Sequence, residues 1–260
     1  MPGERKRSSS SVVRAFEFLD LVAGAGANGA TLTDLARASG LPVSTTHRYI
    51  TTLLDIGALR KASSGQLFLG LKLVTLTGAS LAANTLRTVA RSHLEQLALV
   101  SGETVHLGQH SEQGVVYIDK IDSAKSVRLV SRIGLVVPHY CTAMGKAILA
   151  AMSPEARAPF VAAGHQARTP YTLTGTALEA ELELVEKRRW VVDDQENEEG
   201  VRCLGAAITS HSGELLGAVS ISGPASRFTR QECADLAPTI VKAADSIGRQ
   251  ASWPHPIEST

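Results

Sequence analysis

The sequence predicts an α+β chain in two parts, a small helical part that ends in a β-hairpin and a larger mixed part built around an antiparallel sheet. Three observations predict this division. Residues 31–70 have the pattern of two short helices, a tight turn and a hairpin. From residue 85 onward, segments rich in β-branched residues are interspersed with helical segments. A chain of 260 residues is also long enough for two domains, each with its own core.

The first expected helix begins at Ser11. Apolar residues recur on a broad side of this helix, and we expect that side to pack on the two helices that follow. They are Val12, Ala15, Phe16, Phe18, Leu19 and Val22. The glycine-rich residues 24–29 then predict a flexible joint.

The next two helices have clear start and stop signals. Thr31, with Asp34 three residues later, resembles a capping box at the start of the first. Gly40 adopts a left-handed conformation at no steric cost, and Pro42 prevents the helix from continuing, so the first helix should end here. Ser44 is predicted to cap the second helix.

The second of these helices has one inward and one outward face. Thr46, Ile50 and Leu53 recur at helical spacing, whereas Thr45, Arg48 and Thr52 lie on the opposite side. Hydroxyl groups near a helix N-terminus can donate to phosphates, and an arginine one turn later can reach a phosphate or the O6/N7 edge of guanine. The outward face therefore suits a DNA duplex.

A basic hairpin follows this helix. Leu59 and residues 66–69 are expected strands around the turn at residues 63–65, with Arg60 and Lys61 on the first strand. Helices and hairpin together have the outline of a winged helix-turn-helix, which predicts double-stranded DNA as a partner. The candidate DNA-binding residues are Thr33, Ser44, Thr45, His47, Arg48, Tyr49, Thr52, Arg60 and Lys61.

The distribution of charge agrees with this division. The whole chain has a net charge of +1, but residues 1–84 hold a net charge of +4 and the remainder a net charge of −3. A basic module on a mildly acidic body fits one part that binds a polyanion and one that does not. Arg5, Lys6 and Arg7 could form an arm on the DNA backbone or belong to a disordered tail; both readings stay open.

Composition argues against several other classes of protein. No apolar segment approaches the roughly 20 residues that span a bilayer, and the charged, serine-rich start lacks the apolar stretch of a secretory signal, so we expect a cytoplasmic protein with no membrane partner. The cysteines Cys141, Cys203 and Cys233 are odd in number and lack a pairwise spacing pattern. This argues against a disulfide framework and a zinc module, and we expect no metal and no cofactor.

The rest of the chain predicts a linker helix over residues 71–84 and a mixed domain over residues 85–252, followed by a disordered tail over residues 253–260. The expected helices of this domain cover residues 85–100, 143–152, 154–163, 176–189 and 229–250. The expected strands cover residues 104–109, 115–121, 127–133, 190–193, 203–210 and 215–222.

Three stretches resemble the isocitrate-lyase-regulator family of bacterial transcription factors: STTHRYI, PHYCTAMGKAILA, and WVVDDQENEEGVRCLGAAI followed by LLGAVSISGPASR. The resemblance implies a winged helix-turn-helix over residues 1–70, the linker helix, and a GAF-like effector-binding domain over residues 85–252. It also implies an effector pocket. The implied pocket residues are Ala143, Met144, Asp193, Cys203, Ser220 and Ser222.

Physical chemistry supports such a pocket. Ser220 and Ser222 lie two apart on an expected strand, so their hydroxyls share a face about 7 Å apart. Backbone N–H groups of residues 143–145 at a helix N-terminus favour an anion. Asp193 would accept a hydrogen bond or be protonated, which favours a small carboxylate that also has a neutral polar group. The expected apolar wall is Leu129, Val137 and Val201.

Two other classes compete with this interpretation. An enzyme would use Cys203 as nucleophile, with His106, His110, His139 or His211 as base, and a metal sensor would use those histidines with Cys141. The sequence contains no common catalytic motif and no close metal-ligand spacing. We therefore expect no enzyme but a ligand-responsive, sequence-specific DNA-binding regulator, a repressor of catabolic or metabolic genes. We expect it to bind a palindromic operator as a homodimer or tetramer.

Overall fold

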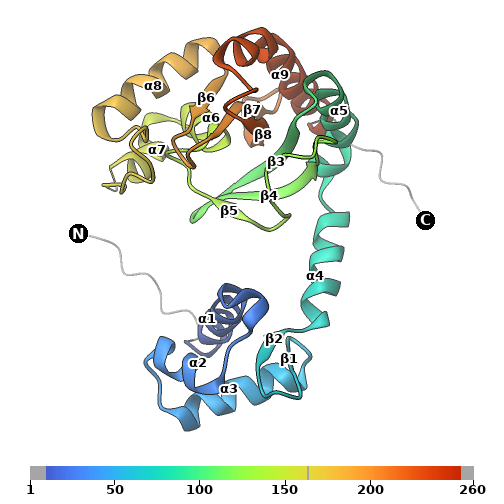
Figure 1. Ribbon diagram of the computed structural model, residues 1–260, viewed down its shortest axis with the longest axis vertical. Helices are drawn as coiled ribbons and strands as arrows, with labels where there is room; N and C mark the ends of the chain where they lie inside the picture. Colours follow the sequence, from blue (N-terminus) through green and yellow to red (C-terminus); the bar gives the residue numbers. More distant parts are fainter. Residues whose placement is uncertain (1–9, 163, 253–260) are drawn as a thin grey trace. The chain divides into compact units, whose positions relative to one another are not determined.

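The computed structural model describes residues 10–162 and 164–252. The chain divides into two compact units, Met1–Ala83 and Asn84–Thr260, which are drawn in Figure 1. The basic residues at positions 5–7 and the predicted tail at residues 253–260 lie outside the described residues. Within the described part, no helix is long and apolar enough to cross a membrane.

The amino-terminal unit is helical with a two-stranded antiparallel hairpin. Its elements are α1 (Ser10–Gly24), the 3-10 turn η1 (Gly26–Asn28), α2 (Leu32–Ser39), α3 (Val43–Asp55), β1 (Leu59–Lys61), β2 (Leu67–Leu69) and α4 (Leu71–Ala82). One core joins α1, α2, α3 and the hairpin, with Phe18, Leu35 and Ile50 among its buried side chains. This arrangement confirms the expected helix-turn-helix followed by a hairpin.

The signals at the ends of α2 behave as expected, whereas the signal assigned to α3 does not. Thr31 and Asp34 form a capping box, and Gly40 follows α2 with a left-handed φ of 67°. The prediction that Ser44 caps α3 is wrong, because the cap is Pro42 and Ser44 already lies inside the first turn. The extended backbone of Pro42 places its carbonyl to accept from the Thr46 amide, so the helix begins earlier.

Helix α1 buries a narrower face than its sequence predicts. Phe18 and Val22 are buried against α2, α3 and β2, but Val12 and Phe16 are 57% and 62% exposed. The expectation that all the apolar residues of α1 face the core is therefore wrong for these two. The physical reason is that α2, α3 and the hairpin cover one side of α1, while its apolar positions extend around more of the helix.

The carboxy-terminal unit is built around a six-stranded antiparallel sheet, as expected, and helices cover both faces of this sheet. Its strand order is β5-β4-β3-β8-β7-β6. The strands are β3 (Thr104–Ser111), β4 (Gly114–Ile121), β5 (Val136–Val137), β6 (Val191–Asp194), β7 (Val201–Thr209) and β8 (Leu215–Pro224). The helices are α5 (Thr85–Ser101), α6 (Ala143–Ala151), α7 (Pro154–Val161), α8 (Gly175–Arg188) and α9 (Arg230–Ala251).

The two faces of the sheet carry different helices. Helices α5 and α9 pack beside one another over one face, whereas α6 covers the other and contacts α8 (Figure 1). A glycine lets α6 approach the sheet closely: a Cβ atom on Gly205 would lie 2.7 Å from the carbonyl carbon of Ala143. The N-terminus of α6 therefore rests directly on β7.

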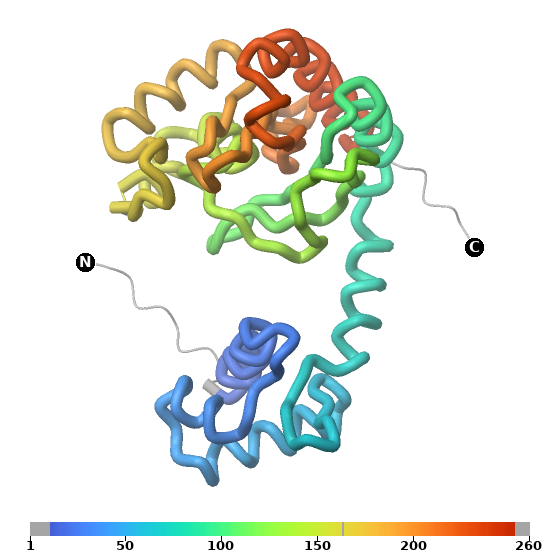
Figure 2. The backbone as a smooth tube through the Cα atoms, viewed as in Figure 1, coloured from blue at the N-terminus to red at the C-terminus, as the bar shows by residue number. Residues whose placement is uncertain are grey.

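The expected strand over residues 127–133 is absent. This segment belongs to an irregular connection between β4 and the short strand β5 (Figure 2). Side chains take up two of its carbonyls: Arg227 donates to Val127 at 2.7 Å, and Lys120 donates to Ser131 at 2.8 Å. Because these backbone groups bond to side chains instead of a neighbouring strand, the β-branched residues here do not form a ladder.

Candidate functional site

The outward face of α3 presents the central candidates for DNA binding. Ser44, His47, Arg48 and Thr52 are exposed, while Thr46 and the apolar residues beside it on the helix face the core. Arg48 has no side-chain hydrogen bond or ion pair to any residue that the structure describes. Its guanidinium therefore remains available to a phosphate or a base edge.

The other candidates in this unit differ in exposure. Thr33 on α2 and Lys61 on the hairpin are exposed, and the Arg60 guanidinium lies 4.5 Å from the centre of the Phe68 ring. Tyr49 is half-buried on the side of α3 that faces α1, with its ring 5.5 Å from that of Phe18. Thr45 is also half-buried. The exposed row is thus narrower than the set expected from sequence.

The nine residues expected to bind an effector line one cavity, which we call the effector cavity. They are Leu129, Val137, Ala143, Met144, Asp193, Val201, Cys203, Ser220 and Ser222. These residues come from β5, α6, β6, β7, β8 and the connection after β4. The cavity volume is about 70 Å³, which is several times the space that one water molecule needs.

Two hydroxyl groups in the effector cavity have no hydrogen-bond partner among the residues that the structure describes. They belong to Ser220, which is 2% exposed, and to Tyr117, which is 8% exposed. Buried polar groups in folded proteins almost always have a hydrogen-bond partner. Neither oxygen is among the fully buried atoms without a partner, so both face the open space of the cavity and can bond to water or to a polar ligand. Tyr117 was not among the expected site residues, although its strand was predicted.

The N-terminus of α6 offers fewer donors than expected. The Thr142 hydroxyl caps this helix by accepting from the Gly145 amide at 3.1 Å. The prediction that the amide of residue 145 is open to a ligand is therefore wrong. The amides of Ala143 and Met144 remain, at a helix end where the dipole favours negative charge.

Asp193 is a buried acid on β6 with an altered pKa. Burial, together with the nearby Glu196 carboxylate, raises its pKa to about 7. Its Oδ1 accepts from the backbone amides of Glu196 at 2.7 Å and Asn197 at 3.4 Å. Asp193 can therefore exist protonated or ionised near neutral pH, so it can donate to a ligand or accept from it.

A buried ion pair between Lys146 and Glu196 lies close enough to Asp193 to influence its pKa. Lys146 on α6 is fully buried, pairs with Glu196 and donates to the Val192 carbonyl at 2.8 Å. Burial raises the pKa of Glu196, and Lys146 opposes that rise. Sequence analysis did not single out this pair, because the two residues lie 50 positions apart.

His106 is another buried residue that the predicted effector site did not include. Its ring is buried, with Nε2 2.8 Å from the Ser131 hydroxyl and Nδ1 3.5 Å from the Ser222 hydroxyl. Burial, with Lys120 nearby, lowers its pKa to about 3, so the ring is neutral at ordinary pH. His106 thus contacts both the connection after β4 and strand β8, at two serines that line the cavity. Its place follows from the pairing of His106 with Ser220.

The chemistry of Cys203 argues against a nucleophile. Burial and the Asp193 carboxylate raise the pKa of its thiol well above the ordinary value, and the thiolate is the reactive form. Within the described part of the chain, no histidine forms a hydrogen bond to Cys203. His110 bonds instead to His139, with 2.9 Å between Nδ1 and Nε2. Over the same residues, no group of three or more His, Cys, Asp or Glu side chains is arranged to hold a metal.

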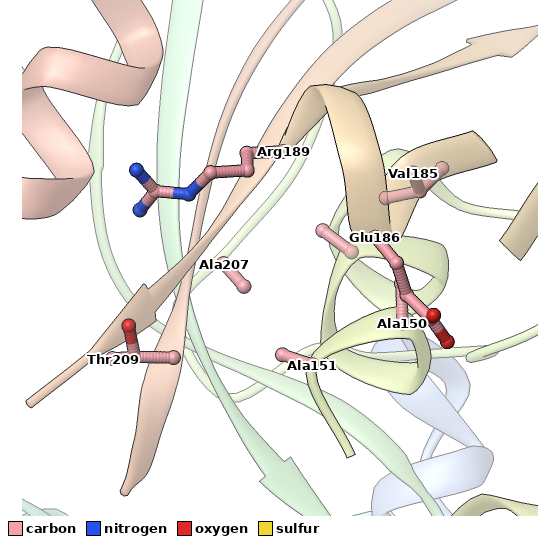
Figure 3. A pocket seen from close by; sticks show the side chains of 8 residues that line it. Ala150, Ala151, Val185, Glu186, Arg189, Ala207 and Thr209 are labelled. Carbon is pink, nitrogen blue, oxygen red and sulfur yellow. The ribbon is translucent and has the colours of Figure 1, made fainter. Parts of the chain in front are cut away.

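A second cavity, of about 160 Å³, lies among α6, α8 and β7 (Figure 3). Alanine side chains form part of its lining, and Glu186 and Arg189 supply its charges. Both charges already have partners: Glu186 pairs with Arg157, and Arg189 donates to Asp245 at 3.2 Å. This cavity contains none of the predicted site residues.

Comparison with known proteins agrees with both parts of the fold. Residues 11–63 match the IclR helix-turn-helix domain, and residues 78–249 match the bacterial transcriptional regulator IclR C-terminal domain. The chain is 32% identical over 242 residues to the transcriptional repressor IclR of Escherichia coli. The alignment covers 91% of this chain and 88% of that protein.

Solved structures show the same architecture. The crystal structure of Thermotoga maritima IclR matches with a TM-score of 0.72 and 31% identity, over 94% of this chain and 99% of that one. An IclR homologue from Microbacterium hydrocarbonoxydans, crystallised with 4-hydroxybenzoate, shares the fold with a TM-score of 0.76 and 23% identity, over 93% and 97% of the two chains. With a helix-turn-helix at one end and the matching carboxy-terminal domain at the other, the chain belongs to the IclR family of bacterial transcriptional regulators.

Proposed function

We propose that this regulator binds a palindromic operator in a sequence-specific manner, represses catabolic or metabolic genes, and responds to a small organic acid. The observation that carries the effector part of the proposal is the effector cavity, where residues distant in sequence meet around open polar groups. In this proposal residues 1–70 bind DNA, residues 71–84 link the two parts, and residues 85–252 bind the effector.

Exposure and charge support the DNA-binding part. Ser44, Arg48 and Thr52 stand on the outward face of α3, and the hairpin adds two exposed basic residues. Two copies of α3 related by twofold symmetry would meet successive major grooves on one side of a duplex. We therefore propose a homodimer or a tetramer as the DNA-binding species, with Arg48 reading a base or contacting a phosphate.

The polar groups of the effector cavity support an acid as effector. Serine and tyrosine hydroxyls, two helix N-terminal amides and the titratable Asp193 can together bind carboxyl, hydroxyl and carbonyl oxygens. The Microbacterium relative crystallised with 4-hydroxybenzoate was solved with a ligand of this class. The relatives named above are regulators, and the high pKa of the Cys203 thiol gives no support to catalysis.

A thermal-shift screen of small carboxylates, followed by operator binding with and without each hit, tests this proposal. A ligand at a hundredfold excess over its Kd stabilises the folded state by about 2.7 kcal/mol. We expect a stabilising acid to weaken or strengthen operator binding, and Ser222→Ala to abolish that response while leaving DNA binding intact. If Ser222→Ala still responds to the acid, the effector binds outside the effector cavity. If the protein binds no genomic DNA fragment specifically, the proposed sequence-specific DNA binding is refuted.

A further inference from the structure

Val43, at the first position of α3, is an apolar side chain that lies exposed beside polar ones. It is 54% exposed and lies outside the core that joins α1, α2, α3 and the hairpin. Leu41, two residues earlier, differs in this respect, because it is partly buried against that core. The packing of this unit therefore does not account for Val43.

A separate apolar groove of the same unit does not account for Val43 either. This groove lies between α1 and α3, has a volume of about 380 Å³, and includes Val12, Tyr49 and Ile56 in its lining, but not Val43. With 3.6 residues per turn, Val43 and Ile56 point in directions about 140° apart around the axis of α3. A partner that fills the groove would therefore leave Val43 exposed.

The neighbours of Val43 on α3 belong to the candidate DNA-binding residues. Ser44 follows it directly, and His47 lies one turn further along the same side of the helix; both are exposed. When a helix-turn-helix binds DNA, its second helix lies in the major groove and the first residues of that helix contact base edges. Val43 thus stands where the edge of a base is expected.

The chemistry of this position matches one base. In the major groove, thymine presents its C5 methyl group beside the O4 acceptor, whereas the other bases present only hydrogen-bonding groups. Val43 can bury a methyl group but cannot bond to a donor or an acceptor. His47 complements it, because the Thr51 hydroxyl lies 3.5 Å from its Nδ1, which leaves Nε2 to donate to an acceptor such as O4.

We propose that Val43 reads the methyl group of a thymine in each half-site of the operator. This inference rests on the proposed function and adds an apolar determinant of specificity to the polar residues of α3. Removing the thymine methyl group should weaken binding about fourfold for each half-site, because the group is then no longer buried against Val43.

Selection from random DNA, followed by replacement of single bases, tests this inference. The wild-type chain first selects duplexes with a random core of about 30 base pairs, which is long enough for two half-sites one or two helical turns apart. Each thymine of the enriched motif is then replaced by deoxyuridine, which still pairs with adenine but lacks the methyl group. Fluorescence anisotropy measures Kd for the wild type, for Val43→Ala, and for the control Val13→Ala, which shortens another exposed valine of the same unit. Melting temperatures show whether each variant is folded.

We expect uracil at one thymine of each half-site to weaken binding by the wild type and Val13→Ala about fourfold per half-site, and Val43→Ala to bind the thymine and uracil duplexes equally. A motif without thymine, wild-type binding unchanged by uracil at every position, or the same loss retained in Val43→Ala would overturn the inference while sequence-specific binding stands. If the wild type enriches no motif, the sequence-specific part of the proposed function fails, and the inference fails with it.

Discussion

The outward face of α3 and the effector cavity differ in how their polar groups are held. Arg48 is an exposed side chain on a single helix, without a side-chain partner among the described residues. Asp193, by contrast, is buried, bonded to two backbone amides and backed by the Lys146–Glu196 pair. We therefore expect substitutions on the outward face of α3 to weaken DNA binding. Substitutions around the effector cavity should instead lower the free energy of unfolding.

The largest expected change in stability follows from breaking the buried ion pair between Lys146 and Glu196. Lys146→Met leaves the Glu196 carboxylate buried without its partner, which should lower the free energy of unfolding by about 3–5 kcal/mol. Urea denaturation measures the change. The control is Lys187→Met, which alters an exposed lysine on α8 and should change stability by less than about 0.5 kcal/mol. Equal effects of the two substitutions would show that the pair does not stabilise the cavity.

A smaller loss of stability is expected where α6 meets the sheet. In Gly205→Ala the new methyl group would lie 2.7 Å from a backbone atom of Ala143, so α6 must shift, at a cost of about 1–3 kcal/mol. Gly78→Ala is the matched control, because no atom lies within 4 Å of the added group and alanine favours a helix. If Gly205→Ala is as stable as Gly78→Ala, the close approach of α6 to β7 does not contribute to the stability of the fold.

The corresponding change on α3 should affect affinity without affecting stability. We expect Arg48→Ala to weaken specific operator binding by about 1–3 kcal/mol if Arg48 reads a base, with an unchanged urea midpoint. Fluorescence anisotropy on operator and on random DNA separates the two possible roles. An equal loss on both would assign Arg48 to a phosphate, and a large loss of stability would contradict the contrast with the cavity.

The most gradual effect, which is spread over several pH units, concerns Asp193. Its pKa is about 7 in the folded protein and near 3.9 when unfolded, so its contribution to stability is complete below pH 4 and is lost as the pH rises through 7. Asp193→Asn removes this loss. The stability of the variant relative to the wild type should therefore rise from pH 4 to pH 7, by up to about 1.4 kcal/mol per unit.

The difference in stability between Asp193→Asn and the wild type separates the contribution of Asp193 from the contributions of the buried histidines. Burial lowers the pKa of His106 to about 3 and that of His139 to about 4, so both reduce stability as the pH falls below about 6.5, the opposite trend. Both proteins contain these histidines, and their effect cancels in the difference. Urea denaturation across this pH range, with Glu199→Gln as an exposed control, measures the slope. A difference independent of pH would show that the folded structure does not raise the pKa of Asp193.

Local signals in the sequence account for much of the fold. The capping box at Thr31, the left-handed Gly40 and the spacing of Ile50 and Leu53 act within a few residues, so they could be interpreted without knowing any tertiary contact. The strands of the antiparallel sheet were predicted from their β-branched residues and the turns between them, although β3 and β8 are buried along most of their length and show no alternation of burial. The signals were ambiguous at Ser44, where a preceding proline set the start of the helix.

Only the tertiary structure decided how distant residues combine. The irregular path of residues 127–133 depends on Arg227 and Lys120, which lie elsewhere in the chain. The neutral state of His106, the raised pKa of Asp193 and the burial of Lys146 likewise depend on which strands and helices become neighbours. The sequence alone determined the two-part α+β architecture and the outward face of α3, because these follow from short-range geometry. Burial and long-range hydrogen bonds decided the rest, because a side chain's solvation and charge state depend on everything packed around it.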